Sequence, residues 1–408
     1  MDGGITMLNI SQFIQENVIH RSVSLFSSDI ENNIDELNRL VNDKRVLVIG
    51  GAGTIGASFI RAILPFKPRQ LVVVDINENG LTELTRDLRS TYHMFVPDDY
   101  KTYPLNYADP IFERIFRQNK GFDIVANFSA LKHVRSEKDR WSVQTLFENN
   151  VLKARKLLDL LSEIPPEHFF CVSTDKAANP VNIMGASKRV MEDMIMSYSD
   201  RFKVSTARFA NVAFSNGSLP AGFLERIAKQ QPLSSPYDVK RYFVSPEESG
   251  QICMLACLLG KNREIFFPKL GEDQMMTFSA IADALLHRLG YEIKQFDTEE
   301  GAREFAAAMP ADSRVYPVYY FKSDTTGEKG FEEFYVEGED IILDRFRALG
   351  VIGSVVPRPQ KELDQFFDKL NQLFAKDNTT KAEIVEAIKE YLPNFTHEEK
   401  GKNLDQKM

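Results

Sequence analysis

The stretch RVLVIGGAGTIG (residues 45–56) decides the fold. It begins as an apolar, β-branched run and continues into a glycine-rich loop, after which TIGASFIRAILPF (54–66) has the pattern of a helix. Glycines here let the backbone turn tightly and approach a pyrophosphate at the positive end of that helix. Because the loop satisfies G-x-G-x-x-G between a strand and a helix, it predicts a dinucleotide-binding unit. A strand–turn–helix that binds nothing is the alternative.

The next apolar strand, QLVVVD (70–75), ends in an acidic residue that bears on the choice of cofactor. Asp75 follows Gly56 by 19 residues, near the spacing at which a carboxylate binds ribose hydroxyls. A carboxylate there repels a 2′-phosphate, and no arginine follows in DINENG (75–80), so we expect NAD rather than NADP. The residues of these two segments that we expect to contact the cofactor are Gly50, Gly53, Thr54, Ile55, Gly56, Asp75 and Asn77.

Strands and helices alternate beyond this unit. Continuous apolar strands are expected within YKTYPLNYAD (100–109), FDIVANFSA (122–130) and HFFCVST (168–174), with helices between them, one of them long (139–163). This pattern predicts an α/β fold, a Rossmann-type doubly wound parallel sheet. The expected division is a helical N-terminal extension (1–43), an NAD-binding domain (44–215), a smaller substrate-binding portion (216–356) and a helical C-terminal extension (357–408) with a disordered tail.

Within the N-terminal extension, SSDIENNIDELNRLVNDK (27–44) reads as an amphipathic helix capped by serine or aspartate. It is expected to pack on the outside of the sheet or on a partner subunit. We expect a homo-oligomer, and the terminal extensions carry no chemical motif and would serve assembly.

Charge and composition exclude several classes of function. The 408 residues carry a net charge of −8, which argues against nucleic acid and against an anionic membrane surface, yet leaves room for an anionic ligand at a helix N-terminus. Neither a long apolar segment nor a signal-like N-terminus is present, so we expect a cytoplasmic protein. Cys171, Cys253 and Cys257 are too sparse for a disulfide framework or a zinc site, and no metal is expected.

The chemical centre is expected directly after the strand HFFCV (168–172). Ser173, Thr174, Asp175 and Lys176 follow at its carboxyl end, where ligands bind in such sheets. Lys188 is expected on the next helix, where it can hydrogen-bond the nicotinamide ribose. A solvated turn is the alternative for an isolated Thr-Asp-Lys, but its position beside the glycine loop favours a site.

These features resemble the extended short-chain dehydrogenase/reductases, and within them the nucleotide-sugar 4,6-dehydratases that act on UDP-N-acetylglucosamine and similar sugars. The resemblance covers about residues 44–335. The matching pieces are GGAGTIG (50–56), SALKHV (129–134), ENNV (148–151), STDKAANPVNIMGASKR (173–189), RFANVAFSNGS (208–218), RYF (241–243) and GEKGFEE (327–333).

The resemblance implies a redox-neutral elimination that serves surface polysaccharide or glycan synthesis. The catalytic set would be Thr174, Asp175, Lys176, Met184 and Lys188. Asp175 would be the acid at C6 and Lys176 the base at C5, and both would lie beside the sugar. Met184 stands where the superfamily usually has tyrosine, and a thioether cannot take a proton. Some dehydratases share this methionine, so the C4 hydroxyl proton is expected to go to Asp175, directly or through Thr174 or a water.

The resemblance further implies that Asn106, Ala130, Lys132, Asn150 and Lys188 contact the cofactor. It also implies a nucleotide-diphosphate sugar as substrate. His133, Asn211, Ser215 and Arg241 match substrate-binding positions, and arginine suits bidentate binding of a diphosphate. Departures at Ala210, Asn216 and TTGEK (325–329) leave the nucleotide and the sugar open. The alternatives are a nucleotide-sugar 4-epimerase, a non-catalytic NAD-binding regulator and an inactive homologue.

Overall fold

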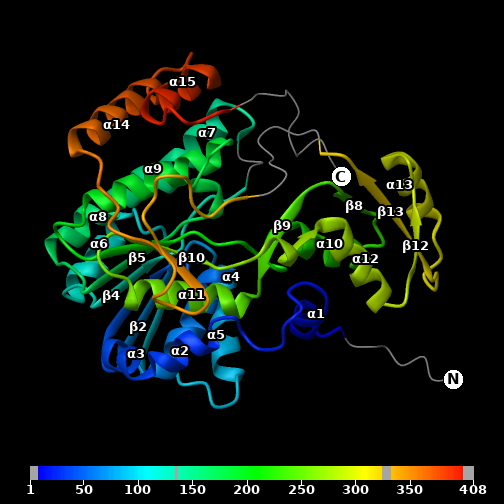
Figure 1. The fold of residues 1–408 in the computed structure, drawn as a ribbon, viewed down its shortest axis with the longest axis horizontal. Coiled ribbons are helices and arrows are strands. Elements are labelled where there is room, and N and C mark those ends of the chain that lie inside the picture. The colour runs from blue at the N-terminus through cyan, green and yellow to red at the C-terminus, as the bar shows by residue number, and fades with distance from the viewer. Residues whose placement is uncertain (1–7, 134–136, 324–331, 398–408) are drawn as a thin grey trace.

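The computed structural model describes residues 8–133, 137–323 and 332–397 (Figure 1). Its centre is a nine-stranded sheet of order β14-β15-β10-β6-β5-β4-β1-β2-β3. Seven neighbouring strands are parallel, and β14 and β15 complete one edge in antiparallel pairing. The strands are β1 (Arg45–Ile49), β2 (Gln70–Asp75), β3 (Asp99–Pro104), β4 (Ile124–Asn127), β5 (His168–Val172), β6 (Val204–Ala207), β10 (Glu264–Pro268), β14 (Ile341–Ile342) and β15 (Leu349–Ile352).

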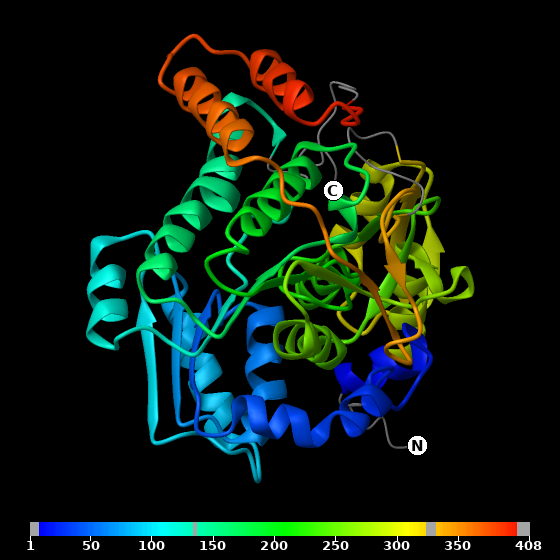
Figure 2. The same cartoon turned by 60° about the vertical axis from the view of Figure 1, so that its left-hand side comes forward.

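This sheet confirms the predicted Rossmann-type fold. Its central strands are buried along almost their whole length, because helices cover both faces of a parallel sheet. One face carries α3 (Ile34–Val41), α4 (Thr54–Ile63), α5 (Glu78–Ser90) and α11 (Pro246–Leu259), and the other carries α6 (Pro110–Gln118), α7 (Arg140–Phe147), α8 (Lys153–Glu163) and α9 (Ile183–Ser197) (Figures 1 and 2).

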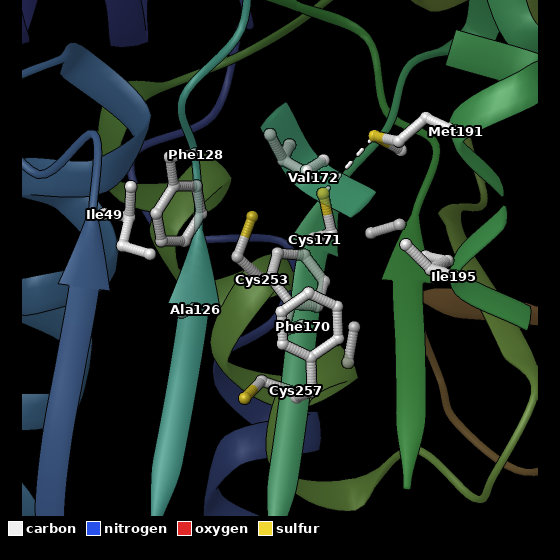
Figure 3. Close-up of a cluster of buried hydrophobic side chains, with 14 of the residues drawn as sticks. Ile49, Ala126, Phe128, Phe170, Cys171, Val172, Met191, Ile195, Cys253 and Cys257 are labelled. Carbon is white, nitrogen blue, oxygen red and sulfur yellow. Dashed lines mark hydrogen bonds between the residues drawn. The ribbon is translucent and has the colours of Figure 1, made fainter. Parts of the chain in front are cut away.

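The three cysteines are free and buried in the core, as predicted. Figure 3 shows Cys171 on β5 with its sulfur 3.3 Å from that of Met191, and Cys253 and Cys257 on the helix behind the strands. Burial raises the pKa of the Cys171 thiol to about 11. The described residues contain no group of three or more side chains able to hold a metal ion. None of their helices is both long and apolar enough to cross a bilayer.

A smaller lobe lies beside the sheet (Figure 1). It has two three-stranded sheets, of orders β11-β9-β7 and β12-β13-β8. Its elements are β7 (Asn211–Val212), α10 (Leu219–Ala228), β8 (Leu233–Pro236), β9 (Lys240–Val244), β11 (Met275–Thr277), α12 (Phe278–Arg288), β12 (Glu292–Gln295), α13 (Glu299–Ala308) and β13 (Val315–Phe321). Helix α1 (Ile10–Asn17) adds Phe13 and Ile14 to the core of this lobe.

The structure differs from the predicted boundary at residue 215. After β9 the chain returns to the main sheet. It adds the strands β10, β14 and β15 to this sheet, and α11 packs against its face. The reason is that β6 needs a partner on its outer side, and the fully buried strand EIFFP (264–268) provides it. Residues 216–356 are therefore divided between the main sheet and the smaller lobe.

The predicted helix over 27–44 is also two helices, α2 (Ser27–Asn32) and α3, and neither start has a side-chain cap. The helical conformation is interrupted at Asn33, which lies between the two helices. Asp29, a candidate cap, is buried and instead accepts hydrogen bonds from the backbone N–H groups of Arg347 and Ala348, at 2.6 and 2.9 Å. The N-terminal extension is thus fastened to the strand β15 of the main sheet.

The C-terminal extension forms a helical hairpin, α14 (Gln360–Phe374) and α15 (Lys381–Tyr391). It covers α7, α8 and α9 (Figure 2), with an ion pair of 2.6 Å between Arg155 and Asp364. The buried Arg140 donates hydrogen bonds to the carbonyls of Phe374, the last residue of α14, and of Lys376 and Asp377 in the turn that follows. Of the tail predicted to be disordered, residues 398–408 lie outside the described residues. Short 3₁₀ turns span Leu64–Phe66, Asp175–Ala177 and Glu272–Gln274.

A buried histidine at the start of β5 makes stability depend on pH. Lys203 Nζ lies 3.1 Å from His168 Nδ1, and burial, followed by this positive charge, lowers the pKa of His168 to about 4. An unfolded histidine titrates near ~6.5, so between that pH and 4 only the unfolded chain takes the proton. We expect the free energy of unfolding to have its full value above about pH 6.5 and to fall by roughly 3 kcal/mol on acidification towards pH 4.

Urea unfolding at pH 7 and at pH 4.5 measures this effect. The variant His168→Gln should lose less stability on acidification than the wild type, because it has no imidazole to protonate. Equal losses in the two proteins would show that His168 is not the group responsible.

Candidate active site

A cavity of about 720 Å³ lies at the carboxyl ends of the strands, between the main sheet and the smaller lobe. One wall comes from the segments after β4 and β5 and from the start of α9, and the other from α10, β8 and β9. Eleven of the residues predicted for the site line it together: Ile55, Ala130, Lys132, His133, Thr174, Lys176, Met184, Lys188, Asn211, Ser215 and Arg241.

The glycine loop has the shape that a dinucleotide requires. Gly50 has a φ of +75°, and a Cβ on Gly56 would lie 2.3 Å from the carbonyl oxygen of Gly50, so the protein's own packing requires both glycines. Gly53 differs, because a Cβ there would meet only that same oxygen, at 3.5 Å. Gly53 is the N-cap of α4, and among the described residues no side chain caps the N-terminus of that helix. This arrangement fits a pyrophosphate.

Two alanine substitutions in this loop should separate folding from binding. In Gly53→Ala the new methyl group is clear of the protein, so the free energy of unfolding should stay within about 1 kcal/mol of wild type. The methyl group should occupy the position of the pyrophosphate and raise the Kd for NAD at least about ten-fold. The control Gly56→Ala should be destabilised, because its methyl group collides with backbone. Calorimetric titration with NAD and urea unfolding measure both quantities; unchanged NAD affinity in Gly53→Ala would contradict the assignment.

The carboxylate of Asp75 holds the glycine loop in place. It accepts hydrogen bonds from the backbone N–H groups of Ala52 (3.0 Å) and Asn77 (2.9 Å). The side-chain oxygen of Asn77 caps α5 by accepting from Gly80 N–H, and that of Asn106 accepts from Ala108 N–H. Asp75, Asn77 and Asn106 therefore each order the backbone in their own neighbourhood, and Asp75 also orders the glycine loop.

Thr54 connects the loop to the smaller lobe. Its hydroxyl oxygen accepts a hydrogen bond of 2.9 Å from the backbone N–H of Asn216. This contact joins the glycine loop to the segment that contains Ser215, which lines the cavity.

The turn after β5 brings three polar groups onto one oxygen atom. Asp175 Oδ1 accepts hydrogen bonds from the Thr174 hydroxyl (2.7 Å), the Lys176 backbone N–H (2.9 Å) and Lys176 Nζ (3.0 Å). Thr174 and Lys176 line the cavity, whereas Asp175 is 3% exposed and lies behind them. The prediction places both Asp175 and Lys176 beside the sugar, and of these two side chains only Lys176 lines the cavity. Asp175 is connected to the cavity by its hydrogen bonds with the side chains of Thr174 and Lys176.

Helix α9 presents Met184 and Lys188 to the cavity. The helix starts at the N-cap Asn182, whose side-chain oxygen accepts from Gly185 N–H at 2.7 Å. Lys188 is buried, and its Nζ donates a hydrogen bond of 3.0 Å to the carbonyl of Val172. Burial lowers the pKa of Lys188, and burial also lowers that of Lys132, which follows β4 in the same wall.

Asn150 is a brace within the site. It lies in a π-helical segment (Glu148–Leu152) between α7 and α8, and such segments often occur at functional sites. Its amide binds both backbone groups of Leu131, at 2.8 and 2.9 Å, and donates to the Ser187 hydroxyl at 3.1 Å. Asn150 therefore ties the segment after β4 to α9, and it does not itself line the cavity.

A buried ionic network supports the turn after β5. The Ser173 hydroxyl donates to Glu192 at 2.6 Å, and Arg208 binds both oxygens of that carboxylate, at 2.9 and 2.7 Å. Burial alone would raise the pKa of Glu192, but the charge of Arg208 and its hydrogen bonds bring that pKa below its usual value. Arg208 also pairs with Glu339 at 3.0 Å, so the network anchors the segment that begins at Glu332.

Sequence reasoning missed several cavity residues. Glu332 is buried in the wall, and its Oε1 lies 3.8 Å from Lys176 Nζ and 3.9 Å from Arg241 Nη2. It belongs to the matched piece GEKGFEE, of which 327–331 lie outside the described residues, as do Val134 and TTGEK. Arg226 Nε and the hydroxyls of Ser234 and Ser235 are buried in the other wall without a hydrogen-bond partner in the described part of the chain.

The charge of the cavity is opposite to that of the whole protein. Five basic and two acidic side chains line it, whereas the chain carries a net charge of −8. The basic residues are Lys132, Lys176, Lys188, Arg226 and Arg241, and the acidic ones are Glu225 and Glu332. Such a cavity attracts an anionic ligand.

Three curated relatives are similar to the chain over most of its length. It is 28% identical over 324 residues to an uncharacterized membrane protein of Methanocaldococcus jannaschii (78% of this chain, 88% of the relative). It is 24% identical over 336 residues to a UDP-N-acetylglucosamine 4,6-dehydratase (inverting) of Campylobacter jejuni (80% and 92%). It is 24% identical over 310 residues to a UDP-glucose 4-epimerase of Rickettsia bellii (73% and 88%). The chain spans about half the length of two other curated relatives, 52% and 54%.

Solved structures share the fold. Pen from Bacillus thuringiensis superimposes with a TM-score of 0.62 at 20% identity, covering 78% of this chain and 89% of that one. DesIV, a dTDP-glucose 4,6-dehydratase from Streptomyces venezuelae solved with NAD and TYD bound, gives 0.53 at 20% identity (71% and 87%). Residues 46–306, well over half of the chain, match the family described as polysaccharide biosynthesis protein. The chain has the fold of the extended short-chain dehydrogenase/reductases and belongs to the polysaccharide biosynthesis protein family.

Proposed function

We propose that the protein is an NAD-dependent nucleotide-sugar 4,6-dehydratase that acts on UDP-N-acetylglucosamine or a similar sugar. The observation that carries the proposal is the shared oxygen of Asp175, which joins a hydroxyl and an ammonium group that both line the cavity. Dehydration needs one group that exchanges protons with oxygen atoms of the sugar and a second that exchanges a proton with C5. The Campylobacter jejuni relative, named for this reaction, supports the proposal.

The cofactor fits the glycine loop, because the space in front of Gly53 and the N-terminus of α4 suits a pyrophosphate. When bound there, NAD would supply a reversible hydride acceptor, so that a hydride could leave C4 of the hexose and return to C6. Asp75 would bind the adenosine ribose, and the ammonium group of Lys188 would approach the nicotinamide ribose from α9.

The proton steps follow from the contacts of the turn. The Thr174 hydroxyl, which donates to Asp175, would accept the proton of the C4 hydroxyl as its own proton passes to the carboxylate. The same pair would then return a proton to the C6 oxygen as it leaves as water. Lys176 would first lose its resting proton to bulk solvent. As a neutral amine it would then take the C5 proton and later give one back, so that protons balance over the cycle. Met184 would only shape the wall, since a thioether holds no proton.

The nucleotide end of the substrate would lie across the smaller lobe. Arg241 suits a bidentate contact with the diphosphate. The buried, unpartnered polar atoms of Arg226, Ser234 and Ser235 would hydrogen-bond the nucleoside, because buried polar groups in proteins are normally satisfied. That a homo-oligomer forms stays a prediction.

Mass spectrometry of a panel of UDP-, GDP- and CDP-sugars after incubation with the protein and NAD tests the proposal. A dehydratase gives a product that is lighter by one water. A 4-epimerase, favoured by the Rickettsia relative, gives a product of unchanged mass, and a non-catalytic NAD-binding protein gives none. The Asp175–Lys176 pair favours the dehydratase, since epimerisation needs neither a C5 base nor a C6 acid.

A further inference from the structure

We propose that Glu332 is a positioning residue that couples binding of the diphosphate at Arg241 to the placement of Lys176. The inference rests on the proposed function. Its basis is one atom, Glu332 Oε1, which lies between a cation at the reacting end of the cavity and a cation at the nucleotide end.

Glu332 is held in a fixed position. The next residue but one, Phe334, is buried, and its carbonyl accepts a hydrogen bond of 3.1 Å from Arg208. The ring of Phe334 stacks on Phe267 of β10 and contacts Tyr242 of β9, the neighbour of Arg241. A buried carboxylate is costly unless cations compensate it, and Lys176 and Arg241 do so here.

Lys176 lies between two carboxylates with different positions. Asp175, at 3.0 Å from Nζ, is behind the cavity wall, whereas Glu332, at 3.8 Å, is part of that wall. The attraction to Glu332 therefore holds the ammonium group towards the cavity. Without this charge, Asp175 draws Nζ out of the cavity and away from the carbon that it serves.

Arg241 connects this balance to the substrate. Its Nη1 donates to the backbone carbonyl of Lys240 at 2.8 Å, and its Nη2 is directed to Glu332. A diphosphate binds a guanidinium in bidentate fashion and competes with Glu332 for it. As Arg241 turns to the diphosphate, Glu332 is no longer shared between Arg241 and Lys176. Its attraction for Lys176 therefore grows, so the base is placed when the substrate is present. The same carboxylate repels the diphosphate and limits its affinity.

The variant Glu332→Gln separates these effects, with Glu333→Gln as the matched control because Glu333 is exposed and adjacent. Loss of the negative charge should tighten binding of UDP, measured by calorimetry with saturating NAD, by about five-fold. The kcat for the sugar that the wild type dehydrates should fall at least about ten-fold. Glu332→Asp should recover part of kcat, and Glu333→Gln should match the wild type in both measurements.

Tighter UDP binding together with a lower kcat in Glu332→Gln supports the inference. It is overturned by an unchanged kcat, or by weaker UDP binding with a lower unfolding midpoint, which is what a purely structural role predicts. If the wild type dehydrates no sugar, the proposed function fails separately. UDP binding then still decides whether Glu332 acts on the anion site: tighter binding in Glu332→Gln supports this part, and unchanged binding overturns it.

Discussion

Replacing Lys176 with alanine should stop the elimination of water while leaving NAD affinity unchanged. Lys176 is the amine in the cavity wall, 3.0 Å from Asp175, and in our account it takes the proton from C5. Removing a group that transfers a proton typically lowers kcat by about 10²–10⁴-fold. In deuterated water the wild type should introduce deuterium at C5, and Lys176→Ala should not.

An exposed lysine of the smaller lobe gives the control, since Lys229→Ala removes the same charge at a residue that does not line the cavity and should keep full activity. Full deuterium exchange at C5 in the Lys176 variant would refute its role as the base. Loss of both activity and NAD binding would mean that the substitution had disturbed the fold.

The second large effect is expected at Thr174. Thr174→Val keeps the shape of the side chain but removes the hydroxyl that links the cavity to Asp175 at 2.7 Å. The first proton transfer should then fail, so the sugar should no longer reduce the bound cofactor, and kcat should fall by about 10²–10⁴-fold. Absorbance of the reduced cofactor in a single turnover measures this step.

Three further variants make the test specific. Thr174→Ser keeps the hydroxyl and should retain most of the activity. Asp175→Asn should be slow, and the double variant Thr174→Val/Asp175→Asn should be hardly slower than either single one, because residues that act as a unit are not additive. A Thr174→Val protein that reduces its cofactor at the wild-type rate would exclude the hydroxyl from the proton path.

The sequence predicted those parts of the fold that depend on neighbouring residues. The glycines after β1, the continuous apolar strands and the helices between them follow from local pattern, and the sheet confirms them. The break at Asn33 was missed because Asp29 bonds to backbone near β15, a contact between distant parts of the chain. The return of β10 to the sheet was missed for the same reason, since short apolar strands after residue 215 do not indicate their partner.

The candidate site shows the same limit. Position after β5 was enough to single out Thr174, Asp175 and Lys176, but not to show that the carboxylate lies behind the other two. In the sequence, the residues of the smaller lobe lie between Lys176 and Glu332, so no sequence spacing predicts that these two side chains meet. Which of several nearby acidic side chains faces a cavity is decided by packing, here by Phe334 against Phe267.

The most direct test of the central claim follows one hydrogen atom. UDP-N-acetylglucosamine carrying deuterium at C4 is incubated with the protein and NAD, and the product is analysed by mass spectrometry and NMR. Our account predicts a product that has lost one water and carries the deuterium at C6. A product of unchanged mass with the deuterium back at C4 would contradict it.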